Sequence, residues 1–352
     1  MKKIFVPALL LVASFALAQA VTPLTLESAV QQAFKNGPDI ASSMATLENA
    51  KADLKAKEAD PSTLILQLTQ AQNTMELNAA QVQAKRIEVV GSVTNAFISL
   101  YEAQENIATL EANVNLDQRN LDVAKAKLAQ KNGTQLDVAK AQNTLASDKQ
   151  SLSDAKANLP ILSNKLEPLL GLGLNANLTA GDPPAFKEVK IDLATLQNGL
   201  EKRVASVLQA SQSVEIAALN VQLADNDYTA PATLRDSKTT LENAKRSLET
   251  SRSSAITSLK DAYRSVLNSL ERVKVADKDL DNQKESLAQD NVKFKNGTIS
   301  KLQLEQTNVA TLKSQYSYVQ ATDNYLKALN QVSSAAGTDV TGLVATGMGG
   351  AK

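Results

Sequence analysis

The 352-residue chain has no cysteine, no histidine and no tryptophan, and aromatic residues make up only 3% of it. Without cysteine there can be no disulfide and no thiol nucleophile, and without histidine the commonest general base and metal ligand are missing. Most zinc and copper sites therefore lack their usual ligands. These absences argue against an enzyme, and we expect no catalytic group, no cofactor and no bound metal.

An excess of charge of one sign is also absent. Lys and Arg together number 37, as do Asp and Glu. No overall field therefore favours nucleic acid as a partner. The carboxylates of Asp277, Asp279 and Asp281 lie close together in the sequence, but they occur in a polar stretch with no apolar pocket around them. We interpret them as solvated residues of a helix.

The first twenty residues are typical of a signal peptide. Two lysines precede an apolar stretch from Ile4 to Leu17, and Ala18 and Ala20 frame a small-x-small cleavage site. The stretch is too short to span a bilayer comfortably, so we expect cleavage after Ala20 rather than a membrane anchor. We therefore predict an exported protein of the periplasm, the outer membrane or both, in a diderm bacterium.

Helix-breaking residues are scarce over two long stretches. No proline occurs between Pro61 and Pro160 or after Pro231, and glycine is missing from most of the same stretches. Because proline and glycine are the residues that interrupt helices, these gaps predict uninterrupted helices at about 62–131 and 231–295. At 1.5 Å per residue, each would be on the order of 100 Å long.

Aliphatic residues recur at every seventh position along both stretches. Three or more sustained heptads indicate a coiled coil rather than a globular amphipathic helix. The longest series are Val93, Leu100, Ile107, Val114, Leu121 and Leu128; Leu259, Val266, Val273, Leu280, Leu287 and Phe294; and Val138, Leu145, Leu152, Leu159 and Leu166.

The chain also repeats itself. Residues 26–60 align without a gap onto residues 193–227, and the Lys-Asn-Gly-Thr of 131–134 recurs at 295–298. Each half is interpreted as a short helix, a medium helix, a very long helix, a tip turn and a returning helix. At each tip we expect the helix to stop at glycine and the following threonine to cap the next helix. The predicted fold is all-α, with two tandem-repeated halves of long antiparallel coiled-coil hairpins.

Composition divides the chain into five segments. We predict a signal peptide at 1–20, a first helical repeat at 21–170 and an irregular linker at 171–190. A second helical repeat at 191–336 and a flexible glycine-rich tail at 337–352 complete the chain.

Two local motifs resemble the TolC family of outer-membrane efflux ducts. The segment 24–30, followed by Ala33 and Asn-Gly-Pro-Asp-Ile at 36–40, is similar to the family's N-terminal opening. The segment 133–138, followed by Ala141, Gln142 and Leu145, resembles the family's helical tip. Together with the tandem duplication, the similarity covers nearly all of the mature chain.

The resemblance implies a homotrimer that forms a tapering α-helical barrel in the periplasm and exports solutes passively. It also implies that the tips face a periplasmic adaptor and an inner-membrane pump. The same tip residues would cap the helices in any case, so capping is the alternative explanation for them. The implied docking residues are Gly133, Thr134, Gln135, Leu136, Gly297, Thr298, Ile299 and Leu302.

The sequence departs from the family pattern in two respects. Family members carry a β-hairpin between the medium and the very long helix of each half, and these hairpins build the membrane barrel. Here the joints at 60–63 and about 227–231 are shorter than the nine to eleven or so residues that one membrane strand needs. We therefore predict a TolC-like protomer whose membrane β-strands are largely absent. A barrel-less periplasmic coiled-coil scaffold or spacer is the alternative function.

The second departure concerns the acidic residues that narrow the duct in the family, just past the second tip. By spacing, those positions are occupied here by Gln303 and Gln306, with Glu305 displaced by one residue. Asp137 occupies the corresponding place at the first tip, where the turn is two residues shorter. These four residues are the candidates for a duct constriction.

Overall fold

The computed structural model describes residues 23–174, 176–181 and 186–348. The predicted signal peptide and the last four residues lie outside these ranges. Over the described part of the chain, no helix combines the length and the apolar composition needed to cross a membrane.

The first half contains the helices that the sequence predicts. The long helix α3 runs for 65 residues without a break, as the absence of proline predicts, and Gly91 does not interrupt it. A short 3₁₀ turn, Glu167–Leu170, ends the half. The helices are α1 (Leu26–Asn36), α2 (Pro38–Ala59), α3 (Ile65–Ala129) and α4 (Gln135–Leu166).

The second half repeats this order with one difference. Its long helix α8 again has 65 residues, but the counterpart of α1 is divided into α5 and α6. The division occurs at Gly199, whose φ of 79° is left-handed and interrupts the helix. The helices are α5 (Leu193–Gln197), α6 (Leu200–Arg203), α7 (Ala205–Ala224), α8 (Pro231–Lys295), α9 (Lys301–Ala336) and α10 (Leu343–Gly347).

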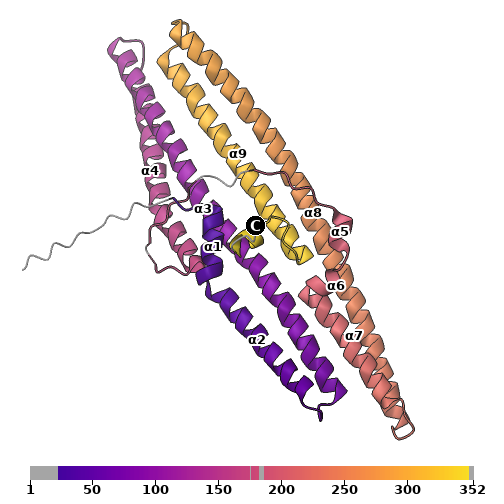
Figure 1. Cartoon of the computed structure of the whole chain (residues 1–352). Coiled ribbons are helices and arrows are strands. Elements are labelled where there is room, and N and C mark those ends of the chain that lie inside the picture. The colour runs from indigo at the N-terminus through magenta and orange to yellow at the C-terminus, as the bar shows by residue number, and fades with distance from the viewer. Residues whose placement is uncertain (1–22, 175, 182–185, 349–352) are drawn as a thin grey trace, which may run out of the picture.

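The helices form an elongated, thin assembly (Figure 1). α3 packs against α4 along one part of its length and against α2 along the other, and α8 does the same with α9 and α7. The halves meet where α3 contacts α9 and α7. The helix order is therefore α4–α3–α9–α8 on the side of the tips and α2–α3–α7–α8 on the side of the joints.

The predicted heptads are the buried seams of these hairpins. Val93, Leu100, Ile107 and Leu121 are buried on α3, and Leu259, Val266, Val273 and Leu280 are buried on α8. Burial weakens toward the second tip, where Phe294 is exposed. The largest apolar cluster surrounds Phe97 at mid-length, where α1, α4 and α10 also pack on α3.

The prediction of a flexible tail is wrong for residues 337–348. Residues 337–348 are folded, because α10 buries Leu343 and Val344 in the same cluster as α1. Two of the glycines that suggested flexibility make turns: Gly337 ends α9 with a φ of 62°, and Gly342 precedes α10 with a φ of 79°. Asp339 braces the turn by accepting hydrogen bonds from the backbone N–H groups of Thr341 and Val344.

The joints between medium and long helices contain no strand, as predicted. α2 and α3 are joined by residues 60–64, and α7 and α8 by residues 225–230. In the described ranges, β-type pairing is limited to one isolated bridge between Leu24 and Ala180. The side chain of Gln104 on α3 holds that bridge in place by hydrogen-bonding both backbone groups of Ala180, at 3.1 and 2.8 Å.

Candidate functional site

The first tip is a tight turn closed by a capping box. Thr134 begins α4: its hydroxyl accepts the N–H of Asp137 at 3.2 Å, and the Asp137 carboxylate accepts the Thr134 N–H at 2.9 Å. These hydrogen bonds from Thr134 hold the pKa of Asp137 below its usual value. The predicted threonine cap is therefore correct here. The left-handed residue that ends α3 is Lys131, with a φ of 59°, and not Gly133 as predicted.

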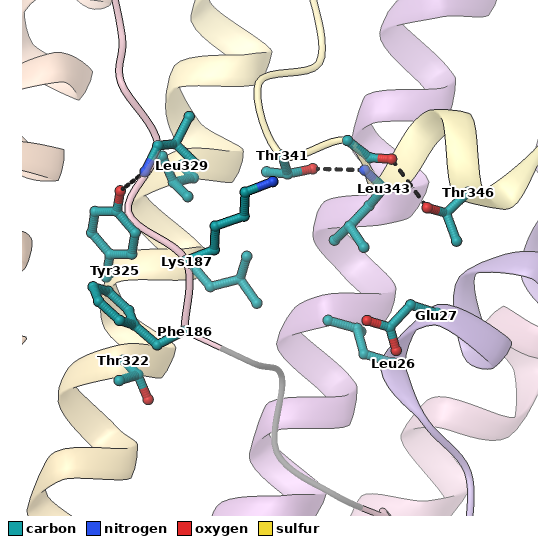
Figure 2. A pocket seen from close by; sticks show the side chains of 13 residues that line it. Leu26, Glu27, Phe186, Lys187, Thr322, Tyr325, Leu329, Thr341, Leu343 and Thr346 are labelled. Atoms are coloured by element: carbon teal, nitrogen blue, oxygen red, sulfur yellow. Dashed lines mark hydrogen bonds between the residues drawn. The ribbon is translucent and has the colours of Figure 1, made fainter. Parts of the chain in front are cut away.

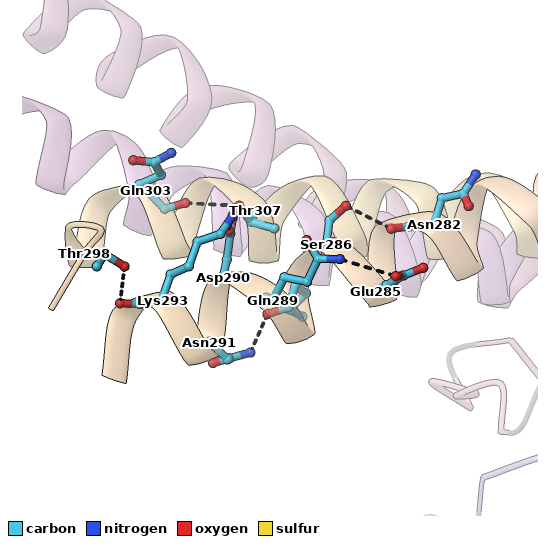
Figure 3. Close-up of polar contacts among 11 residues, drawn as sticks. Asn282, Glu285, Ser286, Gln289, Asp290, Asn291, Lys293, Thr298, Gln303 and Thr307 are labelled. Carbon is cyan, nitrogen blue, oxygen red and sulfur yellow. Dashed lines mark hydrogen bonds and ion pairs between the residues drawn. The ribbon is translucent and has the colours of Figure 1, made fainter. Parts of the chain in front are cut away.

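The second tip has the same turn geometry, but its left-handed residue and its helix cap are at different positions of the repeated motif. Gly297 is left-handed, with a φ of 70°, as predicted. The cap is Ser300, whose hydroxyl accepts the Gln303 N–H at 3.2 Å. Thr298, the predicted cap, instead donates its hydroxyl to the Lys293 carbonyl at 2.8 Å (Figure 3).

The two copies of the Lys-Asn-Gly-Thr motif therefore occupy different positions in their turns. The left-handed residue is the first residue of the motif at the first tip and the third residue at the second tip, a shift of two residues. Measured from the left-handed residue to the cap, both turns have equal length, Lys131 to Thr134 and Gly297 to Ser300. The structure thus aligns Leu136 with Leu302, and Asp137 with Gln303. The two-residue difference that the sequence suggests is a difference in where α3 and α8 end.

The eight candidate docking residues all lie at these two turns, at the same end of the molecule (Figure 1). Thr134, Gln135, Gly297 and Thr298 are exposed, whereas Gly133, Ile299 and Leu302 are half-buried. Leu136 has 61% of its surface exposed, which makes it the large apolar side chain that the first tip presents.

The four constriction candidates are not brought together as one acidic group. Asp137 is used in its capping box, and Gln303 follows the Ser300 cap, while the Gln306 side chain is exposed. Glu305 is paired with Arg119 of α3, Nε to Oε2, at 2.5 Å. A constriction role for these residues stays a prediction.

The Arg119–Glu305 ion pair is a contact that sequence reasoning missed. It joins the two hairpins a few turns from the tips, since Arg119 lies on α3 and Glu305 on α9.

The second hairpin also has a polar contact of its own, between α8 and α9. Thr307 donates to Asp290 at 2.7 Å, and Lys293 lies 2.9 Å from the same carboxylate, so the pKa of Asp290 is lowered (Figure 3).

A buried polar cluster lies where α3 packs on α9 at mid-length. Asp323 of α9 is 2% exposed and faces Glu102 of α3. Lys327, one turn along α9, lies 3.6 Å from Glu102. Burial raises the pKa of Asp323 to about 7, the charge of Glu102 acts in the same direction, and Lys327 opposes both. On the same two helices, Thr94 and Asn330 bury side-chain atoms that have no hydrogen-bond partner.

The cluster continues a heptad series that apolar residues alone do not reveal. Leu302, Val309, Tyr316, Asp323 and Asn330 are seven residues apart, and the last two are buried polar residues. A polar residue at a seam position lowers stability but fixes the register of the helices that meet there. Counting polar residues at heptad positions would have marked Asp323 and Asn330 as candidate seam residues, but not the helix that they face.

A cavity of about 300 Å³ lies between α1, α9, α10 and the segment 186–189 (Figure 2). Its walls are mainly apolar, and Phe186 and Tyr325 meet there with ring centroids 5.5 Å apart. The Tyr325 hydroxyl accepts the Val189 N–H at 2.9 Å. These contacts fasten the linker to α9. The described ranges contain no cluster of three or more potential ligands that could hold a metal ion.

Exchanging lysine and glycine at the left-handed position of each tip should change the free energy of unfolding in opposite directions. Lys131→Gly should raise the free energy of unfolding by about 1 kcal/mol, because glycine adopts a positive φ without strain. Gly297→Lys should lower it by about the same amount, through backbone strain alone, since no atom lies within 4 Å of the new Cβ. Urea unfolding of both variants measures this. Changes of the same sign would contradict the assignment.

Asp323 predicts a pH-dependent stability. Its pKa is about 7 in the folded protein, against a usual value of 3.8, so the folded state holds one more proton than the unfolded state between these values. The free energy of unfolding should therefore fall as pH rises from about 4 to 7, by up to about 1.4 kcal/mol per unit. Asp323→Asn should flatten this slope, and the exposed Asp277→Asn should leave it. An unchanged slope in Asp323→Asn would assign the effect to another group.

Comparisons with known proteins agree with this architecture. The profile of the outer membrane efflux protein family matches residues 64–172 and 229–338, one match in each half. The outer-membrane channel OprN is 15% identical, with a TM-score of 0.63 and 90% of each chain covered. VceC from Vibrio cholerae is 14% identical, with a TM-score of 0.63, over 90% of this chain and 96% of that one.

The CmeC outer membrane channel of Campylobacter jejuni is 14% identical, with a TM-score of 0.63, over 90% of this chain and 86% of that one. At such identities the likeness shows a shared fold. A search of curated proteins finds no match. The family consists of efflux proteins and not of enzymes. Because the family match covers more than half of the chain and falls on the long hairpin of each half, the chain belongs to the outer membrane efflux protein family.

Proposed function

We propose that the protein is the periplasmic helical duct of an efflux or secretion assembly, formed by a homotrimer that exports solutes passively. Family membership and the hairpin architecture support this proposal. The observation that carries it is the exposure of large apolar side chains on the two helices that border the layer on the side of the tips: Ile161 on α4, and Leu267, Val275 and Val292 on α8.

The two edges are formed by α4 on one side and by α8 on the other. On α4, Ile161 is exposed, and on α8, Leu267, Val275 and Val292 are exposed. Isolated exposed aliphatic residues are ordinary, but a row of them on a coiled-coil edge favours pairing with another helix. An α8 edge that packs on the α4 edge of the next copy is a head-to-tail contact, and such contacts close into rings.

The heights of the edge residues match this pairing. Ile161 lies 26 residues from the tip end of α4, and Leu267 lies 28 residues from the tip end of α8. These separations correspond to about 39 and 42 Å along the helices. With the tips of neighbouring copies level, Ile161 and Leu267 would meet. The number of copies, three, comes from the family resemblance.

Cross-linking tests the ring directly, because the chain has no cysteine of its own. The variant Ile161→Cys/Leu267→Cys, treated with a short bismaleimide, should give a ladder that ends at three linked chains. Either single-cysteine variant should give no ladder, and neither should Val123→Cys/Leu267→Cys, since Val123 lies on α3.

The alternative function, a periplasmic coiled-coil scaffold or spacer, is favoured by the strand-free joints at 60–64 and 225–230. It predicts unlinked monomers in the same experiment and release of the protein with the soluble periplasm. The duct predicts linked trimers that sediment with the outer membrane.

We also propose that the tips dock with a periplasmic adaptor, which in turn contacts an inner-membrane pump. The eight tip residues Gly133, Thr134, Gln135, Leu136, Gly297, Thr298, Ile299 and Leu302 form the proposed surface. Leu136 is its main apolar contact, because it is the large side chain that capping leaves exposed.

Leu136→Asp tests this docking in a strain that lacks the chromosomal copy. The buried contact would acquire an unpaired charge, so export should fall to the level of the deletion strain, measured as susceptibility to a panel of toxic solutes. Leu174→Asp is the control, because Leu174 is 66% exposed and lies in the linker rather than at a tip. Equal susceptibility of the two variants would remove the docking role.

A further inference from the structure

The dipeptide Asn-Gly occurs four times in the chain, each time at the end of a helix or just after it. Asparagine is readily deamidated in this dipeptide, because glycine has no Cβ to hinder attack on the asparagine side chain. All four asparagines are exposed, so access to solvent does not distinguish them. The dipeptides are Asn36-Gly37, Asn132-Gly133, Asn198-Gly199 and Asn296-Gly297.

Deamidation begins when the glycine backbone nitrogen attacks the carbonyl carbon of the asparagine side chain. The new C–N bond closes a succinimide ring, and the bond to the side-chain nitrogen breaks. That nitrogen leaves as ammonia and takes the proton that the glycine N–H has lost. Water then opens the ring at either carbonyl group and gives aspartate or isoaspartate. A hydrogen bond that holds the glycine N–H must be broken first, so it slows the attack.

Two of the four glycine N–H groups are held in this way. Gly297 donates its N–H to the Phe294 carbonyl at 2.9 Å, and Gly37 donates its N–H to the Ala33 carbonyl at 2.8 Å. These hydrogen bonds belong to the last turns of α8 and α1. The attack on the preceding asparagine therefore requires that a helix end opens.

The other two N–H groups, those of Gly133 and Gly199, have no hydrogen-bond partner among the described residues. At the first tip, Lys131 takes the place that Gly297 has at the second, and its N–H donates to the Leu128 carbonyl at 2.9 Å. Gly133 therefore lies beyond the hydrogen-bonded turn. Gly199 lies between α5 and α6, outside both helices.

We propose that Asn132 and Asn198 are sites of spontaneous deamidation in the folded protein, whereas the hydrogen bonds at the helix ends protect Asn36 and Asn296. The Lys-Asn-Gly-Thr motif is then modified at the first tip and stays as encoded at the second. The product at the first tip carries a new carboxylate, and isoaspartate also adds a methylene group to the backbone of the turn. The modification goes beyond the duct and holds for a single chain.

Peptide mass spectrometry of the wild-type chain tests the proposal. The folded protein is incubated at mildly alkaline pH, and aspartate plus isoaspartate at each site is measured over time after rapid digestion. Asn132 and Asn198 should deamidate at least about fivefold faster than Asn36 and Asn296, which is the effect of one hydrogen bond. In urea, which removes the fold, the four rates should become similar.

A matched variant moves the dipeptide to an unprotected position of the second tip. Thr298→Asn/Ile299→Gly places Asn-Gly where the first tip has Asn132 and Gly133. The N–H of residue 299, like that of Gly133, has no partner among the described residues. The introduced asparagine should therefore deamidate about as fast as Asn132. Asn36 is the internal control, because its rate rises only if the helix end or the whole chain unfolds.

The reverse variant, Gln130→Asn/Lys131→Gly, places Asn-Gly at the hydrogen-bonded position of the first tip. Because the N–H of residue 131 donates to the Leu128 carbonyl, the introduced asparagine should be as slow as Asn296.

Equal rates at the four sites of the folded chain would overturn the proposal, and so would a faster rate at Asn296 than at Asn132. Slow deamidation of the asparagine introduced at position 298 would contradict the protective role of the hydrogen bond. None of these results bears on the trimer or on docking, which cross-linking and susceptibility measure independently. The duct and the modification can therefore fail separately.

Discussion

Side-by-side packing of helices is the constraint on which the whole structure depends. Each of α3 and α8 is 65 residues long, which is about 98 Å and far more than a compact domain could enclose. Such a helix can bury apolar surface only along a narrow stripe, against another helix. The heptad seams around Val93 and Leu259 provide that stripe, and the core is therefore extended along the molecule instead of concentrated at its centre. Low aromatic content follows from the same constraint, since closely paired helices have little room for large rings.

The contact between the two halves is built differently from the contacts within each half. Apolar heptads close the α3–α4 and α8–α9 hairpins, whereas the α3–α9 seam includes Asp323, Glu102 and Asn330. Burying such groups costs free energy, and it lets proton binding influence how tightly the halves hold together. The Arg119–Glu305 ion pair adds a second polar contact nearer the tips.

The two ends of the molecule are finished in contrasting ways. At the tips, the side chains of Thr134 and Ser300 accept hydrogen bonds from backbone N–H groups in the first turns of α4 and α9. The turns are therefore compact, and these hydrogen bonds are made within the chain. At the joints, Leu64 and Ala230 begin α3 and α8 without a side-chain cap, and Tyr228 stands almost wholly in solvent.

The sequence by itself determined the helices, the hairpins and the repeat, because local signals suffice: a 65-residue stretch without proline has few alternatives, and heptads show which face pairs. It also predicted the strand-free joints from their length alone. Only the tertiary structure decided the tip register, since a left-handed Lys131 and a Ser300 cap depend on where each hairpin seam ends. The tertiary structure also decided that α10 forms a helix, because five residues are too few for a stable helix except when they pack against α1. The Asp323 seam needed the structure as well, because Asp323 and Glu102 lie far apart in the chain, and periodicity within one helix does not reveal which partner it faces.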